Sequence, residues 1–432
     1  MPNPATNRRT VRVQIPVRSG FGDGARKLSL ALILLATAQA ANAVERIYEV
    51  LYEADIDPAR QQAVMTLSLN QPNDFVRELR FRIDPERYAD FDGEGELEVD
   101  GEYVLWSPPV TGGKIRWTVS LVSRRGNGSY DGLITPEWAV FRGDDLVPPV
   151  FTRSLKGARS SARLRFKLPE GWSSITPYRK TDSGEYLITN QQRNFDRPTG
   201  WMALGRLGVR WATIADIQVG VAGPVGQDLR RQDLLALMRW TLPTLVSIFP
   251  NLGDRLLIVG AGDPMWRGGL SGPSSLFIHA DRPLISENGT STLLHELVHV
   301  ATSLRAAPGA DWIVEGLAEY YALEVLVRSG TTSPRRHRVS LEDVSEWGDS
   351  AEDLFVESAQ GEVTARAVVI MGRVDEEIRK GSDGRRSLDD VARALSKQGQ
   401  VSFDSFRTLA DEMAGGPVKA LNPKRLPGEP QG

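Results

Sequence analysis

The pattern of apolar residues changes once along the chain, near Gly223-Pro224, and this change constrains the fold more than any other feature. From Val44 to about Gly220, short alternating stretches such as Ala63–Leu69 and Lys114–Val122 are separated by Pro-Pro, Gly-Gly, Asp-Gly and Asn-Gly pairs. Such alternation between turn residues is typical of antiparallel strands. We therefore predict an α+β protein whose first half is an antiparallel β-sandwich.

After the change, apolar residues recur at the spacing of helices. A proline, Pro243, is expected to kink or end the first of these helices. The expected helices are 228–249, 290–304, 311–328 and 365–380, with shorter ones at 387–394 and 403–413. Two apolar stretches, 255–259 and 275–279, are expected to be strands. The second half is therefore expected to be a mainly helical domain.

These patterns divide the chain into four segments. Residues 1–43 are expected to be a signal peptide, 44–222 the β-sandwich, 223–414 the mainly helical domain and 415–432 a disordered tail. The tail is predicted to be disordered because it is rich in proline and glycine and has little apolar surface to bury.

The first segment has the order of parts found in export signals. Arg26-Lys27 precede the apolar run Leu28–Ala36, and Ala41-Asn42-Ala43 has the small-x-small form that signal peptidase cuts. The run is too short to cross a bilayer of about 30 Å as a helix. We expect cleavage after Ala43, a periplasmic or secreted location, and no stable membrane span after cleavage. A retained membrane anchor is the alternative.

Composition excludes several kinds of chemistry and partner. The chain contains no cysteine, so it can form no disulfide, thiolate metal site or cysteine nucleophile. Its 52 basic and 55 acidic residues are interspersed and give a net charge of −3. This balance indicates no nucleic-acid partner.

The segment His295-Glu296-Leu297-Val298-His299 carries the strongest chemical signal. Two histidines four positions apart on a helix lie on one face, where both imidazoles can bind one zinc ion. Glu296 lies beside them and is the candidate general base that would take a proton from zinc-activated water. The alternative is a half-buried helix that happens to carry two of the four histidines of the chain.

A third candidate ligand, Glu315, follows on the next predicted helix, four positions before Glu319. Two carboxylates at this spacing repel each other unless a positive group lies between them. A zinc ion and a histidine N–H would supply that group, with Glu315 as ligand and Glu319 holding a zinc-bound histidine in place. The alternative for Glu319 is an ordinary solvated helix residue.

Together with Glu315-Gly316-Leu317-Ala318-Glu319-Tyr320-Tyr321, the histidine motif resembles the gluzincin metallopeptidases, the thermolysin-like clan. It is most similar to the glycyl aminopeptidase family, which has a Trp-x-x-Glu-Gly segment, a tyrosine pair and a preceding β-sandwich. The Gly-Gly-Leu stretch of that family is matched by Gly268-Gly269-Leu270. The spacing from His299 to Glu315 is somewhat shorter than in well-known members. The resemblance implies a thermolysin-like domain, one Zn²⁺ per chain, and a peptide or protein substrate.

The resemblance also implies a strand edge that pairs with the substrate and a donor that stabilises the oxyanion. The strand candidate is 275–279, with Ser275, Phe277 and His279 as its residues, although His279 is also consistent with an ordinary strand histidine. The donor is left open among His337, an arginine, Tyr320 and Tyr321. For His337, within a stretch expected to be a loop, the alternative is a solvated loop residue.

The sequence thus predicts an exported zinc metallopeptidase. The alternatives are a strict aminopeptidase and a catalytically idle, zinc-stabilised binding or assembly factor. Aminopeptidases pair the free amine of the substrate with a carboxylate. Where the resemblance leads us to expect a glutamate directly after Gly-Gly-Leu, this chain has Ser271. We therefore expect peptides with free and with acetylated amino termini to be cut comparably.

Overall fold

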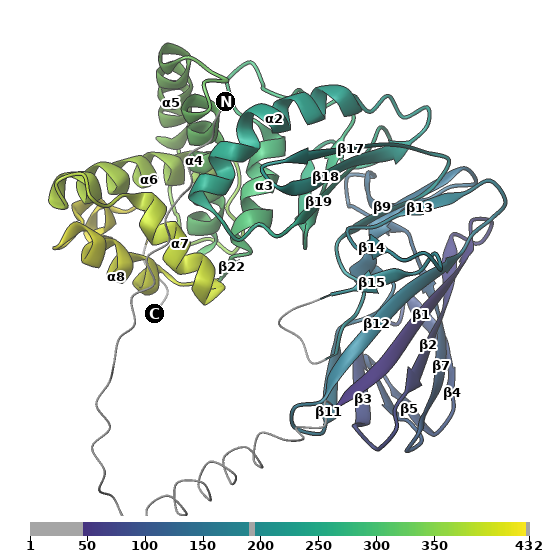
Figure 1. Ribbon diagram of the computed structural model, residues 1–432. Helices are drawn as coiled ribbons and strands as arrows, with labels where there is room; N and C mark the ends of the chain where they lie inside the picture. Colours follow the sequence, from purple (N-terminus) through teal and green to yellow (C-terminus); the bar gives the residue numbers. More distant parts are fainter. Residues whose placement is uncertain (1–45, 190–194, 429–432) are drawn as a thin grey trace, which may run out of the picture. The chain divides into compact units, whose positions relative to one another are not determined.

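The alternating stretches of the first half form three sheets in the computed structural model, which describes residues 46–189 and 195–428 (Figure 1). The predicted signal peptide lies outside the described residues. The largest sheet has seven strands, in the spatial order β14 (Arg179–Lys180), β15 (Tyr186–Ile188), β12 (Arg159–Lys167), β1 (Ile47–Asp57), β2 (Gln62–Asn70), β7 (Gly112–Ser120) and β4 (Tyr88–Gly93). Neighbouring strands in it are antiparallel except β1 and β12.

A second sheet has four antiparallel strands, in the order β11 (Val150–Ser154), β3 (Val76–Arg82), β6 (Tyr103–Ser107) and β5 (Glu96–Asp100). Every second residue of β2 is buried, as expected for a strand with one face on a core. Phe81 from the four-stranded sheet packs against Trp117 from the seven-stranded sheet, with ring centroids 5.9 Å apart. The two sheets therefore share one core, and the predicted β-sandwich is confirmed.

A third sheet leads from the sandwich to the second half of the chain. Its order is β13 (Ser173–Ile175), β16 (Trp201–Gly205), β10 (Trp138–Arg142), β9 (Tyr130–Ile134) and β8 (Ser123–Arg124). Trp201 lies 5.2 Å from the ring of Phe277, and its backbone N–H donates to Ser275 Oγ at 2.7 Å. These buried contacts fix the third sheet against the strand that contains Ser275.

The second half contains a five-stranded sheet, in the order β17 (Leu207–Ile214), β18 (Ile217–Pro224), β19 (Arg255–Ala261), β21 (Ser275–His279) and β20 (Gly269–Gly272). The predicted domain boundary between residues 222 and 223 falls inside β18. Because β18 pairs with β19, the sheet of the second half already begins at Leu207. Alternation identifies β17 and β18 as strands but does not reveal which sheet they join.

Helices make up most of the remaining chain, as predicted. They are α2 (Arg231–Ile248), α3 (Thr292–Thr302), α4 (Asp311–Arg328), α5 (Pro334–Gly348), α6 (Glu362–Gly381), α7 (Leu388–Gln398) and α8 (Phe403–Ala414). Figure 1 shows α2 lying along the sheet formed by β17, β18 and β19. Pro243 lies inside α2 and does not end it. Within the described residues, no helix combines the length and apolar character needed to cross a membrane.

Five short elements complete the part of the chain that the structure describes. They are the parallel pair β22 (Arg305–Ala306) and β23 (Gln400–Val401), and the 3-10 helices η1 (Gly143–Asp145), η2 (Lys419–Leu421) and η3 (Pro423–Arg425), of which η1 belongs to the sandwich region. The prediction of a disordered tail is wrong for residues 415–428. Leu421 is fully buried, and Glu377 of α6 accepts hydrogen bonds from the backbone N–H groups of Lys419 and Ala420. The few apolar residues of this segment suffice to anchor it.

The stretch Ser333–Arg336 was expected to be a loop and instead begins α5. The Ser333 side chain accepts a hydrogen bond from the Arg336 backbone N–H at 3.2 Å, and Pro334 occupies the first turn. Serine at the N-cap followed by proline is a favourable helix start. His337 is therefore a helical residue and not a loop residue.

Candidate active site

Helix α3 presents the two histidines of the central motif on one face. The Ser291 side chain caps the helix by accepting from the Leu294 backbone N–H, and Ser303 ends it in a left-handed conformation. The other faces of α3 pack into the core through its leucines and Val298. Only the polar face is left for His295 and His299, whose side chains are each 15% exposed.

Three side-chain atoms converge beside this face. His295 Nε2 lies 3.0 Å from His299 Nε2 and 3.2 Å from Glu315 Oε2, and His299 Nε2 lies 3.4 Å from Glu315 Oε1. Zinc bonds of about 2.0–2.1 Å in tetrahedral geometry place ligand atoms roughly 3.3 Å from one another. The nitrogen and oxygen donors therefore fit one zinc ion. In the part of the chain that the structure describes, these three residues are the group that could hold a metal.

Glu319 contacts the same site from one turn further along α4. Its Oε2 lies 2.8 Å from His295 Nδ1. A proton on Nδ1 would be donated to this carboxylate and would leave the Nε2 lone pair directed at the metal position. The predicted contact between Glu319 and one of the two candidate zinc-binding histidines is therefore present.

The charged groups of this cluster shift one another's pKa values. Burial raises the pKa of Glu315, but hydrogen bonds and charges of the two histidines outweigh it, so its pKa lies well below the usual value. Burial lowers the pKa of His295, but Glu315 and Glu319 outweigh it and raise that pKa. The carboxylates thus favour a cation at this position, which is the condition for metal binding.

Glu296 lies beside the triad formed by His295, His299 and Glu315, and its side chain is almost fully buried. Burial raises the pKa of its carboxyl group, whereas the charges of His295 and His299 lower it, and burial prevails. A hydrogen bond from the Ser271 backbone also lowers this pKa. A Cβ on Gly269 would lie only 2.6 Å from Glu296 Cγ. Strand β20 therefore passes directly over the candidate base.

Two cavities meet at the candidate metal-binding residues. The larger, of about 1020 Å³, is lined by Leu270 and Ser271 of β20 and by Arg142, together with residues that follow α3. The smaller, of about 370 Å³, is lined by Gly269 of β20 and by Trp347. Both cavities include His295, Glu296 and Glu315 in their walls. Open space therefore continues along β20 on both sides of the triad.

The predicted substrate strand is wrong, because β21 lies inside its sheet. It pairs with β19 on one side and β20 on the other, and Ser275, Phe277 and His279 are all buried. His279 Nε2 lies 3.4 Å from Asp263 Oδ1, and His279 lines neither cavity at the triad. The edge strand beside the candidate metal-binding residues is β20, which begins six residues before the predicted strand.

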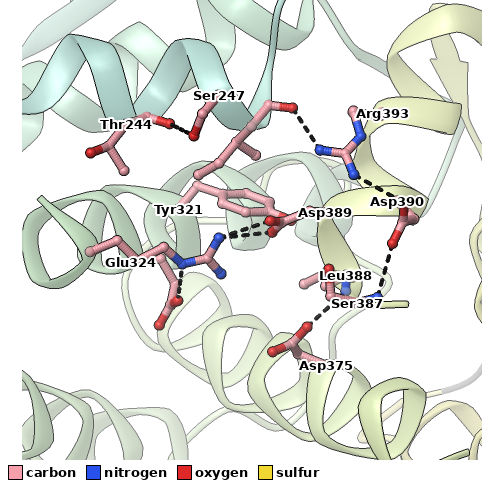
Figure 2. A network of polar contacts seen from close by, with 12 residues as sticks. Thr244, Ser247, Tyr321, Glu324, Asp375, Ser387, Leu388, Asp389, Asp390 and Arg393 are labelled. Atoms are coloured by element: carbon pink, nitrogen blue, oxygen red, sulfur yellow. Dashed lines mark hydrogen bonds and ion pairs between the residues drawn. The ribbon is translucent and has the colours of Figure 1, made fainter. Parts of the chain in front are cut away.

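The three donor candidates named from the sequence, Tyr320, Tyr321 and His337, do not line the cavities at the candidate metal-binding residues. Figure 2 shows Tyr321 directed at Asp389, to which its hydroxyl donates at 3.1 Å. Burial and then Glu324 raise the pKa of Tyr320, which is almost fully buried. His337 Nε2 lies 3.4 Å from Glu324. Neither cavity is lined by any of the three.

The remaining donor candidate was an arginine. Two arginines line the larger cavity: Arg142 from β10 and Arg305 from β22. Sequence reasoning did not single out Arg142, because it belongs to the sandwich half and no motif marks it. Two further acids, Asp311 and Glu357, line the same cavity and were also missed.

Comparison with known proteins bears on the fold. No protein-family model and no curated protein matches the sequence. Among solved structures, an aminopeptidase N family protein from Idiomarina loihiensis aligns over 88% of this chain and 74% of its own, with 14% identity and a TM-score of 0.58. An M1 zinc metallopeptidase from Deinococcus radiodurans aligns over 89% of this chain and 96% of its own, with 14% identity and a TM-score of 0.53. The chain has the fold of these proteins, and the predicted order of a β-sandwich followed by a mainly helical domain is confirmed.

Proposed function

We propose that this chain is a zinc-dependent peptidase. The proposal rests mainly on one observation: three donor atoms spaced for zinc lie beside a buried glutamate that an edge strand covers. Both similar structures bear peptidase names, one an aminopeptidase N family protein and the other an M1 zinc metallopeptidase. Both the fold and the arrangement of the site therefore support peptides as the substrate class.

The roles of the residues follow from their positions. His295, His299 and Glu315 would hold the zinc ion, and Glu319 would keep His295 oriented. The bound ion would lower the pKa of water and polarise a substrate carbonyl. Glu296, whose pKa burial raises, would accept a proton from water and pass it to the leaving amine.

Strand β20 would bind the substrate backbone by strand addition. Because β20 lines the smaller cavity at Gly269 and the larger at Ser271, an extended peptide along it would occupy both sides of the metal. This continuity favours cleavage within a chain over removal of single terminal residues. Asp311 and Glu357 are the acids that a strict aminopeptidase would use instead.

Matched peptides with free and acetylated amino termini separate these two activities. We expect both peptides to be cut with comparable kcat/KM. A strong preference for the free amine would support the aminopeptidase, and its loss in Asp311→Asn or Glu357→Gln would identify the acid.

Metal-binding and turnover measurements test the peptidase itself. His295→Ala, His299→Ala and Glu315→Ala should each lose most of the single bound zinc. Glu296→Gln should keep zinc and lose turnover, because it removes a base and not a ligand. Full activity in Glu296→Gln would contradict the mechanism. A zinc-bound wild type without any turnover would instead support the idle binding or assembly factor.

We further propose that the protein is exported and begins at Val44 after cleavage. The support is the sequence Arg26–Ala43, which lies outside the described residues. N-terminal sequencing of the exported protein tests this, and a mature chain that retains Leu28–Ala41 would indicate an anchor.

A further inference from the structure

We propose that Arg142 forms a subsite for a substrate carboxylate in the larger cavity. This inference rests on the proposed peptidase function and specifies its substrate class: peptides with an acidic side chain or a free C-terminal carboxylate near the bond that is cut.

Arg142 is held at a fixed place in the cavity wall. It is the last residue of β10 and pairs in register with Trp201 of β16. Its guanidinium lies 6.0 Å from the centre of the Trp201 ring, which itself packs against Phe277 of β21. Since β21 pairs with the edge strand β20, these contacts place Arg142 in the wall of the larger cavity, which β20 also lines.

The end of β20 lies close to the same tryptophan. A Cβ on Gly272 would lie 3.3 Å from both Gly200 Cα and Trp201 Cδ1. Ser271, the preceding residue, lines the larger cavity together with Arg142. A substrate bound along β20 would therefore reach the guanidinium as it passes Ser271.

The guanidinium retains donors for a ligand. Its nearest acidic partner is Asp144, with Nε 3.7 Å from Oδ2, which is beyond hydrogen-bond distance. Asp144 already accepts from the Gly200 backbone N–H at 3.0 Å and from Arg197 at 3.4 Å. No hydrogen bond from the Arg142 side chain occurs within residues 46–189 and 195–428, and 39% of that side chain is exposed.

The chemistry at this position selects against an amine. A free α-amino group is cationic or nearly so at neutral pH and would face a permanent positive charge. A carboxylate can instead accept two parallel hydrogen bonds from a guanidinium. Ser271 supplies no competing negative charge on β20. Arg305, the other arginine of the cavity, belongs to β22 and provides a control for its overall charge.

Binding to an inactive protein tests the subsite separately from turnover. Zinc-loaded Glu296→Gln is titrated with peptides that carry one glutamate at successive positions, each matched with a glutamine peptide. A second set compares free C-terminal carboxylates with amides. We expect one carboxylate to tighten binding by about ten- to a hundredfold. Arg142→Gln in the same background should abolish this gain and leave glutamine peptides unaffected, whereas Arg305→Gln should preserve it.

Active protein supplies the second readout. Arg142→Gln should lower kcat/KM for the carboxylate peptide by a larger factor than for its neutral counterpart, and so remove the preference for the carboxylate. Equal losses for both peptides, or no carboxylate preference in either set, would overturn the proposal. Cleavage without a carboxylate preference would contradict the proposed subsite but would still support the proposed peptidase function. Arg142-dependent binding without any cleavage by wild type supports the subsite and contradicts the peptidase.

Discussion

At the scale of single residues, the contact between Glu319 and His295 sets which imidazole nitrogen would face the proposed zinc ion. The 2.8 Å distance to Nδ1 fixes both the ring orientation and the tautomer. Glu319→Gln should weaken zinc binding about 10- to 100-fold, because a neutral amide stabilises the ring less well. Competition with a coloured chelator measures the affinity. Glu376→Gln, an exposed change on α6, is the control, and unchanged affinity in Glu319→Gln would contradict this role.

The candidate zinc ligands could be predicted because helical spacing places His295 and His299 on one face of α3, and because the resemblance pointed to Glu315 on the next helix. The same rule argues against the tyrosines: at about 100° per residue, Tyr320 and Tyr321 lie about 140° and 240° around α4 from Glu315. The two tyrosines therefore cannot lie on the same face of α4 as Glu315, and the sequence alone is enough to exclude them. Arg142 could not be predicted, because its place depends on the packing of Trp201 against Phe277.

At the scale of elements, the packing of α4 against α6 sets the position of two candidate site carboxylates. A Cβ on Gly316 would lie 2.6 Å from Ala367 Cβ, so Gly316→Ala should force the helices apart. We expect a loss of about 1–3 kcal/mol in the free energy of unfolding, measured in urea.

A matched glycine on α6 provides the control for this prediction. A Cβ on Gly372 meets nothing within 4 Å, so Gly372→Ala should be neutral or stabilise by up to about 1 kcal/mol. An equal free energy of unfolding for Gly316→Ala and Gly372→Ala would contradict the close approach of α4 and α6 at Gly316.

Helices with many apolar residues were predicted, whereas the most polar helix was not. Asp311–Arg328 was predicted with its observed bounds, whereas α5 was missed because it buries only Ser340, Val344 and Gly348. The strand at 275–279 was also correct, but its place in the sheet was not. Strand order depends on long-range pairing, which no local pattern contains, so β20 was overlooked as the edge.

At the scale of the whole molecule, the C-terminal segment is part of the core of the second half. Leu421 is fully buried, so Leu421→Ala should cost about 2–5 kcal/mol in the free energy of unfolding. Lys424→Ala, in the same segment but exposed, should have little effect. Thermal unfolding of the two variants measures the difference, and equal stability would restore the expectation of a disordered tail.

The order of a β half and a helical half was predictable because the hydrophobic period changes between them. The way the halves join was not, since it depends on buried contacts between residues far apart in sequence, such as Trp201 and Ser275. Those contacts also bring Arg142 into the larger cavity, so substrate selection is predicted to depend on both halves.

The most direct test of the account is to identify new termini by mass spectrometry in a peptide library incubated with the zinc-loaded protein. Glu296→Gln at equal zinc content serves as the reference. We predict internal cleavages, with and without amino-terminal blocking, in the wild-type sample alone. No new termini, or the same termini with Glu296→Gln, would contradict the assignment of this chain as a zinc peptidase.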